Sequence, residues 1–159
     1  MGKKTEKTNV MRILDRCGVG YNSYDYSFTA ALSGTEVAAA LGKDPACTFK
    51  TLVTQGASKA YYVFMVPVAD ELDLKKAARA AGEKSIAMIK SKDLLPLTGY
   101  IHGGCSPIGM KKQFRTFIHE TAARFDAILF SAGKIGYQVE MPLSGLQKVV
   151  PVTPADIIV

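Results

Sequence analysis

Long hydrophobic runs are absent from this sequence of 159 residues. The longest uninterrupted apolar stretch, Val63 to Ala69, has seven residues, whereas a transmembrane helix needs about 20. The first residues also lack the basic and then apolar order of a secretory leader, because Gly2 to Asn9 is polar and charged. The sequence therefore predicts a soluble protein that neither spans a membrane nor is secreted.

Cysteine and histidine are both scarce. Three widely spaced cysteines, Cys17, Cys47 and Cys105, are an odd number, which is typical of free thiols in a reducing compartment. We therefore expect a cytoplasmic location. Together with Cys105, His102 and His119 match no standard zinc spacing, and nothing in the sequence brings Cys105 and His119 together as a nucleophile pair. We expect neither a metal ion nor another cofactor.

Acidic residues are missing from two windows, although the overall composition is that of a globular protein. Apolar residues make up 48% and charged residues 21%, and the length suits one domain, so we expect residues 1–159 to form a single domain. Twenty bases against fourteen acids give a net charge of +6. No acid occurs between positions 44 and 70 or between positions 93 and 120. The basic residues in these windows are Lys50, Lys59, Lys111, Lys112 and Arg115. Charge alone leaves two interpretations open, an electropositive face for an acidic partner such as RNA and an ordinary solvated surface.

Turn and capping signals divide the chain into short helices and strands. Helices are predicted over residues 8–17, from the capping box Ser33–Glu36 to Gly42, over 74–81 after the N-cap Asp73, over 91–95 before Pro96, and over 143–149. Strands are predicted over residues 21–28, 47–54, 60–68, 85–89, 115–119, 127–131 and 137–141, with a hairpin turn at 55–59 and a helical turn at 121–125. Because the order shows no strict βαβ rhythm, we expect an α+β domain with a curved mixed sheet or barrel flanked by helices.

The most unusual segment is a glycine-rich loop, Gly103-Gly104-Cys105-Ser106-Pro107-Ile108-Gly109. Paired glycines let a backbone approach a ligand closely and aim successive N–H groups at an anion or a carbonyl oxygen. The loop has neither the Gly-Lys-Ser/Thr ending of a Walker motif nor a dinucleotide fingerprint. It is either a binding loop or a tight connection.

Two further segments contain polar groups in an apolar context. Lys50 interrupts an apolar strand pattern, where its ammonium either binds a phosphate or polarised carbonyl or points into solvent. The segment Ser131-Ala132-Gly133-Lys134 follows a predicted strand and either brings a hydroxyl to the same pocket or is a plain turn.

Six segments together resemble the YbaK/EbsC family, the free-standing relatives of the editing domain of bacterial prolyl-tRNA synthetases. In order, they are Phe49-Lys50-Thr51-Leu52, Val66-Pro67-Val68, Leu74-Lys75-Lys76, Thr98-Gly99-Tyr100, the glycine-rich loop and Ser131-Ala132-Gly133-Lys134. The likeness extends from about Val10 to Val150. It implies a mixed β-barrel flanked by helices and an aminoacyl-tRNA deacylase, most simply one that removes cysteine from mischarged tRNA(Pro).

The resemblance also implies roles for particular residues. Lys50 would position the terminal adenosine phosphate or the aminoacyl group, and the backbone amides of Gly103 and Gly104 would hold the substrate carbonyl. The substrate-binding residues would be Tyr26, Ser106, Pro107, Ser131, Gly133 and Gln138. Gln138 departs from the family pattern, which often has Asp there, so this wall of the pocket is polar but uncharged. We expect Lys111 and Lys112 to contact the acceptor end of the tRNA, and prolyl-tRNA synthetase to be a partner.

The sequence contains no secure pairing of a nucleophile with a base, which constrains the mechanism. A cysteinyl ester supplies its own nucleophile, because its thiol can attack its own carbonyl, and proximity can then lower the barrier by roughly 7–11 kcal/mol at best. Cys105 is then a pocket residue and not the catalyst. Two alternatives remain, an editing deacylase for alanyl or seryl esters and a tRNA-binding module without catalysis.

Overall fold

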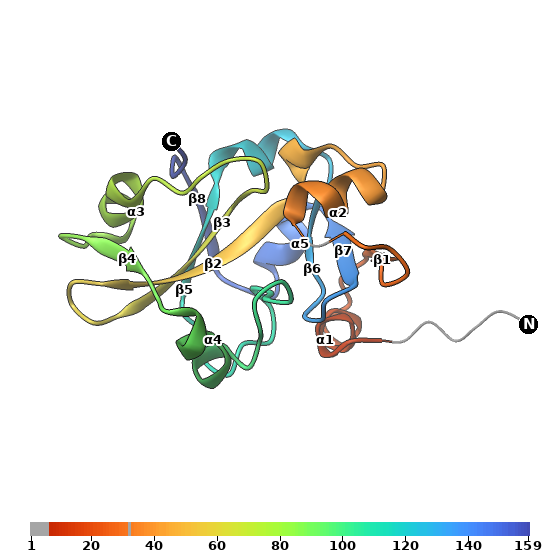
Figure 1. Cartoon of the computed structure of the whole chain (residues 1–159), viewed down its shortest axis with the longest axis horizontal. Coiled ribbons are helices and arrows are strands. Elements are labelled where there is room, and N and C mark those ends of the chain that lie inside the picture. The colour runs from red at the N-terminus through yellow and green to blue at the C-terminus, as the bar shows by residue number, and fades with distance from the viewer. Residues whose placement is uncertain (1–6, 32) are drawn as a thin grey trace, which may run out of the picture.

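The computed structural model describes residues 7–31 and 33–159, which form two β-sheets with helices packed around them (Figure 1). The helices are α1 (Asn9–Arg16), α2 (Gly34–Ala40), α3 (Leu74–Ala81), α4 (Ser91–Thr98) and α5 (Leu143–Gln147), with 3-10 turns η1 (Pro45–Cys47) and η2 (Glu120–Arg124). The strands are β1 (Asn22–Asp25), β2 (Phe49–Gly56), β3 (Tyr61–Pro67), β4 (Ile86–Met88), β5 (Arg115–His119), β6 (Ile128–Ser131), β7 (Tyr137–Met141) and β8 (Val152–Ala155). The predicted α+β class is confirmed.

The two sheets meet at the start of β2. The larger sheet has the strand order β4-β2-β3-β5-β8, in which β2 and β3 form the predicted antiparallel hairpin, whereas β3, β5 and β8 are parallel to one another. The smaller sheet, β1-β7-β6, is antiparallel. A single bridge between Thr48 and Leu129 links them. Over the described part of the chain the strands do not close into a barrel, so the curved mixed sheet is the correct one of the two expected architectures.

Successive side chains of β3 point to opposite faces of the larger sheet, so the hydrophobic core lies on both faces. Tyr62, Phe64 and Val66 face one side, where they pack against α3. Val63 and Met65 face the other side, which is covered by α4, the glycine-rich loop, α1 and the smaller sheet. The β2–β3 hairpin is therefore buried on both faces and gives the site a rigid support.

The strand predicted over residues 21–28 is shorter in the structure, because a turn ends it at Asp25. The Asp25 carboxylate accepts the backbone N–H of Ser27 at 2.8 Å, and the Thr29 N–H donates to the Tyr26 carbonyl at 2.9 Å. Side-chain capping of this kind competes with a strand ladder. As a result, Tyr26 turns into the protein and is buried, whereas Phe28 is 84% exposed.

Helix α4 continues past its predicted end and includes Pro96. A proline here removes one backbone donor, which is tolerable in a short helix whose last turn has other bonds. The Thr98 hydroxyl donates to the Leu94 carbonyl at 2.7 Å. Gly99, with a φ of 87°, ends the helix and donates to the Leu95 carbonyl at 2.9 Å.

Strand β8 was not predicted, because Pro151 and Pro154 interrupt the sequence pattern of a strand. Proline is tolerated in edge strands, where its missing N–H faces away from the sheet. β8 is such an edge and pairs with β5 only. Within the described residues, no helix is long and apolar enough to cross a membrane.

Candidate active site

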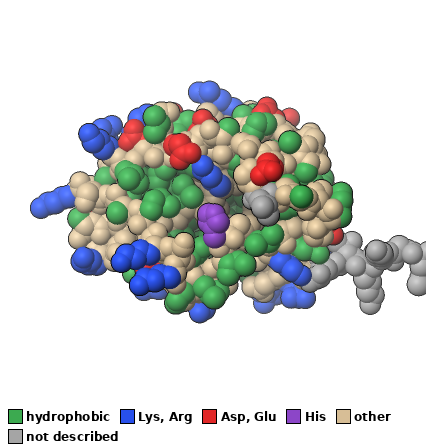
Figure 2. Space-filling model, viewed as in Figure 1, with side chains coloured by type: hydrophobic (Ala, Val, Ile, Leu, Met, Phe, Trp, Pro, Cys, Tyr) green, Lys and Arg blue, Asp and Glu red, His purple; other side chains and the backbone are tan. Residues whose placement is uncertain are grey.

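A cavity of about 390 Å³ lies where the two sheets meet. Figure 2 shows the face of the molecule hollowed near its centre, beside a histidine and a basic side chain. The lining residues are Tyr26, residues 33–35 and Val37 at the start of α2, residues 48–52 on and before β2, Val68, Leu94, His102, Gly103 and Cys105 of the glycine-rich loop, Ser131 and Gln138. His102 immediately precedes the glycine-rich loop. Segments far apart in the sequence therefore share one site.

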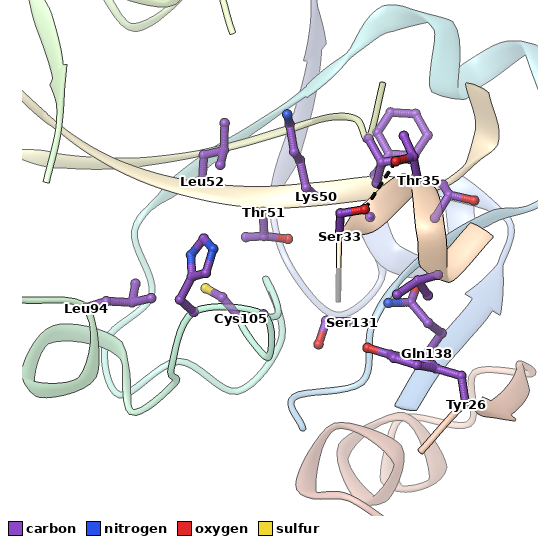
Figure 3. Close-up of a pocket in the computed structure, with 17 residues that line it drawn as sticks. Tyr26, Ser33, Thr35, Lys50, Thr51, Leu52, Leu94, Cys105, Ser131 and Gln138 are labelled. Carbon is purple, nitrogen blue, oxygen red and sulfur yellow. Dashed lines mark hydrogen bonds between the residues drawn. The ribbon is translucent and has the colours of Figure 1, made fainter. Parts of the chain in front are cut away.

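Strand register brings three of the predicted residues together. Ser131 at the end of β6 lies directly opposite Gln138 on β7. Tyr26 follows β1, and its N–H donates to the Gly136 carbonyl at 2.7 Å, which fixes it beside the same turn. Figure 3 shows the side chains of Tyr26, Ser131 and Gln138 at one end of the cavity. All three are buried.

Lys50 lies at the open side of the cavity. Its side chain is 30% exposed, and its ammonium is 3.7 Å from the carboxylate of Glu71, whose own side chain is 83% exposed. In Figure 3 the Lys50 side chain extends to one side of β2, whereas Ser131 and Gln138 lie on the other. The ammonium therefore suits an anionic part of a ligand that stays near solvent, such as a phosphate.

Two buried polar atoms of the cavity wall lack a hydrogen-bond partner. Among the described residues, the buried side-chain atoms without a partner are Thr51 Oγ1, Thr121 Oγ1 and Gln138 Oε1. Thr51 and Gln138 both line the cavity. Because an unpaired buried polar group costs about 1–3 kcal/mol, these two positions favour a polar ligand.

The glycine-rich loop packs against the turn that follows β6. A Cβ on Gly104 would lie 3.2 Å from the backbone nitrogen of Ile135, so only glycine allows this approach without a shift. The Gly104 N–H already donates to the Ile101 carbonyl at 3.0 Å. Within the described chain the N–H groups of Gly103 and Cys105 have no partner, and both residues line the cavity.

Four of the predicted site residues do not line the cavity: Gly104, which was predicted to hold the substrate carbonyl, and the predicted substrate-binding residues Ser106, Pro107 and Gly133. Ser106 is fully buried and its hydroxyl accepts the Ile108 N–H at 3.3 Å, which braces the loop. Gly133 lies against Val10 of α1 and Tyr100, where a Cβ would come within 2.9 Å of the valine side chain. Gly104, Ser106 and Gly133 therefore have a role in the packing of the two loops.

Cys105 is buried in the cavity wall, and burial raises the pKa of its thiol to about 12. The thiol is therefore protonated at neutral pH. His119 is buried too, but its Nδ1 accepts the Ile157 N–H at 3.4 Å, and no hydrogen bond joins it to Cys105 in the described residues. The same residues contain no cluster of ligands suited to a metal ion.

The two predicted RNA-binding lysines lie outside the cavity. Lys111 and Lys112 are exposed just after the glycine-rich loop, and the Lys111 ammonium donates to the carbonyl of Pro96 in α4 at 3.4 Å.

Several lining residues were not predicted as site residues, namely Thr51, Ser33, Thr35 and His102. Ser33 had a signal in the sequence, because it is part of the capping box that begins α2, but that signal indicated a helix start and not a site.

Residues 30–149 match the family of aminoacyl-tRNA editing domains. The chain belongs to this family. A curated relative from Enterococcus faecalis, named "Putative Cys-tRNA(Pro)/Cys-tRNA(Cys) deacylase EbsC", is 48% identical over 141 residues, which are 87% of this chain and 86% of the relative. The resemblance to the YbaK/EbsC family is therefore confirmed.

Solved structures confirm the fold of this editing domain. A crystal structure described as "a putative trans-editing enzyme for prolyl tRNA synthetase" has a TM-score of 0.81 and 21% identity, and covers 97% of this chain and 99% of that one. Hypothetical protein APE2540 has a TM-score of 0.87 and 18% identity, with 96% and 100% coverage. The editing domain is an aminoacyl-tRNA deacylase, a hydrolase whose substrate is aminoacyl-tRNA.

Proposed function

We propose that this editing domain hydrolyses the ester bond of mischarged Cys-tRNA(Pro) and so releases cysteine. It would act in trans, on tRNA that another enzyme has charged. The observation that carries this proposal is that the cavity contains no activated nucleophile among the described residues. Burial raises the pKa of its thiol, Cys105, to about 12, and no hydrogen bond joins this thiol to a base among the described residues. A cavity of this kind favours an ester that brings its own nucleophile. The E. faecalis relative, whose name includes Cys-tRNA(Pro), supports the same substrate.

In the proposed reaction, the substrate thiol loses its proton to water and its sulfur attacks the carbonyl carbon of the same residue. The new C–S bond replaces the ester C–O bond, the ribose oxygen leaves and takes up a proton, and water then opens the cyclic thioester to give free cysteine. The unpartnered amides of Gly103 and Cys105 are suited to stabilise the oxygen that becomes negative. Lys50 would hold the terminal phosphate at the open side, which fixes the ester over the cavity.

The tRNA body would lie outside the cavity. We propose that Lys111 and Lys112, exposed beside the glycine-rich loop, contact the phosphates of the acceptor stem. The described surface offers no large module for reading a particular tRNA, so prolyl-tRNA synthetase is proposed as the partner that supplies tRNA identity. A gel shift of tRNA(Pro) with and without the synthetase tests this association, and unchanged affinity and selectivity would contradict it.

A deacylation panel tests the substrate. Purified protein is mixed with Cys-, Ala-, Ser- and Pro-tRNA(Pro), and release of each amino acid is followed over time. We expect rapid release of cysteine and release of serine at least about 100-fold slower, since a hydroxyl is the poorer nucleophile. Faster cleavage of alanyl or seryl esters would instead assign a different editing specificity.

Replacement of Lys50 tests the site. We expect Lys50→Ala to lower kcat/KM for Cys-tRNA(Pro) by about 10²–10³, the range for removal of one group that stabilises developing or bound charge. The matched control is Lys59→Ala, which removes the same charge from the exposed turn of the β2–β3 hairpin. Equal activity in the two folded variants would remove Lys50 from the mechanism.

A further inference from the structure

Among the described residues, the lining of the cavity contains no carboxylate. Of the described residues that line it, only Lys50 has a side chain that is charged at every physiological pH, and it is a cation. The substrate of an aminoacyl-tRNA deacylase nevertheless has an α-amine next to the ester, and this amine is cationic below its pKa, which is about 7.7–8.0 for α-amino groups. The question is how the cavity accepts it.

Gln138 is the group best placed to contact this part of the substrate. It is 7% exposed, it lies opposite Ser131 on the neighbouring strand, and its Oε1 has no hydrogen-bond partner. The second unpartnered atom of the wall is Thr51 Oγ1. A primary amine in its neutral form can donate N–H to an amide oxygen and to a hydroxyl, while its lone pair accepts a hydroxyl proton.

Three acids on segments next to the cavity have partners outside it. Glu71 pairs with Lys50 at 3.7 Å from the solvent side. Glu140, two residues along β7 from Gln138, accepts the Tyr24 hydroxyl at 2.8 Å and faces Lys43 at 3.4 Å. Glu36 accepts the Ser33 N–H at 3.0 Å as part of the α2 capping box. None of these carboxylates lines the cavity.

Burying an ammonium without a carboxylate is costly, because desolvation penalises the charged form and nearby cations add to the penalty. Resting on the proposed deacylation, we propose that the cavity binds the aminoacyl group with its α-amine uncharged and donating to the side-chain oxygen of Gln138. Gln138 is thereby the residue that selects the protonation state of the substrate. Protonation of the substrate amine weakens binding, so substrate capture rises with pH.

Other groups at the cavity also titrate, so the test must separate them from the amine. The titratable groups that line the cavity are Lys50 on β2, His102 just before the glycine-rich loop, Cys105 in that loop, and Tyr26 after β1. Each of them acts equally on an isostere of the substrate that has no amine. A lactyl group, in which a hydroxyl replaces the α-amine, is such an isostere.

The experiment measures calorimetric binding of two non-hydrolysable probes, adenosine 5′-monophosphate with alanyl or lactyl joined to the 3′ position through an amide. For the wild-type protein we expect the alanyl probe to bind roughly 60-fold more tightly at pH 9 than at pH 6, from an α-amine pKa of about 7.8. The lactyl probe should change by less than about threefold. Alanyl binding that is independent of pH, or tighter at pH 6, overturns the proposal.

Gln138→Glu supplies the missing carboxylate. We expect this variant to bind the alanyl probe more tightly than the wild type at pH 6 and to lose most of the pH dependence, while lactyl binding weakens at every pH. A variant that behaves as the wild type does toward both probes contradicts the role of Gln138. If the wild type cleaves no aminoacyl-tRNA, the proposed function fails; if it cleaves Cys-tRNA(Pro) but binds neither probe, or shows the wrong pH trend, only the present inference fails.

Discussion

Cys105 shows that burial can make a thiol in a cavity wall unreactive. The residue is 9% exposed and lines the cavity that we propose as the editing site, yet burial raises the pKa of its thiol to about 12. At pH 8 a thiol with this pKa is ionised to roughly one part in 10⁴, and only the thiolate is a strong nucleophile. This agrees with the proposal that the substrate supplies the nucleophile.

Alkylation measures this difference directly. With iodoacetamide at pH 8, we expect the exposed Cys17 to be modified within minutes and Cys105 to stay unmodified in the folded protein, as read by peptide mass spectrometry. Reactivity of Cys105 should rise about tenfold per pH unit below pH 12, because its folded-state pKa is raised. Equal rates at the two cysteines in the native protein would show that the thiol is not suppressed.

A substitution completes the same test. We expect Cys105→Ala to keep deacylation within about threefold of the wild type, at a cost of about 1 kcal/mol in the free energy of unfolding from removal of the buried sulfur. Loss of activity beyond about 100-fold in a folded Cys105→Ala protein would assign the chemistry to this thiol.

Single residues were predictable from the sequence where the residue type was unusual for its local pattern. Lys50 interrupts an apolar strand, and the structure places it at the cavity. For Ser131 the sequence left open a pocket hydroxyl or a plain turn, and the family resemblance favoured the pocket; Gln138 was named through the resemblance alone. Thr51 was missed, because threonine is common in strands and its unpartnered hydroxyl becomes visible only in three dimensions.

At the scale of elements, two glycine-containing loops lock the smaller sheet to the larger one. Gly104 of the glycine-rich loop lies against the backbone of Ile135, and Gly133 lies against Val10 and Tyr100. Both approaches are too close for a Cβ. The glycine-rich loop thus serves as a packing element as well as a wall of the site.

Gly104→Ala tests this packing. Its Cβ would lie 3.2 Å from the Ile135 nitrogen, a backbone atom that cannot move alone, so we expect a loss of about 1–3 kcal/mol in the free energy of unfolding. Gly20→Ala is the matched control, because a Cβ there meets nothing within 4 Å. Urea denaturation of both variants makes the comparison, and equal midpoints would mean that the loops tolerate the added methyl group.

Helices and strands were predicted correctly where local interactions determine their ends. The predictions failed where tertiary contacts determine them. Capping residues gave α2 and α3 to within a residue or two, since Ser33 and Asp73 bond the first turns. The predicted end of α4 was wrong, because hydrogen bonds in its last turn make Pro96 tolerable inside the helix. Strand β8 was missed, because its proline is tolerated only at the edge of the sheet. The joining of the two sheets depends on the Thr48–Leu129 bridge, which no local pattern encodes.

At the scale of the whole molecule, the net charge of +6 favours an RNA partner without marking the surface that RNA covers. Lysines occur on both faces of the larger sheet. Lys111 and Lys112 lie on the side of the glycine-rich loop, whereas Lys75 and Lys84 lie on and just after α3, which packs on the opposite face.

The salt dependence of tRNA binding distinguishes these faces. If the RNA lies over the glycine-rich loop, the double variant Lys111→Gln/Lys112→Gln should lower the slope of log K against log salt by about 1.4–1.8, or about 0.7–0.9 for each phosphate that is no longer neutralised. The double variant Lys75→Gln/Lys84→Gln makes the same change in net charge and should leave the slope within about 0.3 of the wild type. Filter binding at several salt concentrations gives both slopes. An equal decrease in the two variants would mean that the RNA is attracted by the net charge and does not contact a defined surface.

The parallel arrangement of β3, β5 and β8 affects how the protein folds during its synthesis on the ribosome. β8 pairs with β5 by its backbone, and Ile157, beyond it, is fully buried against the α3 side of the sheet. A nascent chain that has exposed every residue of the cavity, up to Gln138, still lacks this edge and one wall of its core. Since contacts between distant segments form late, the editing site should become rigid only after residues 152–158 have left the exit tunnel.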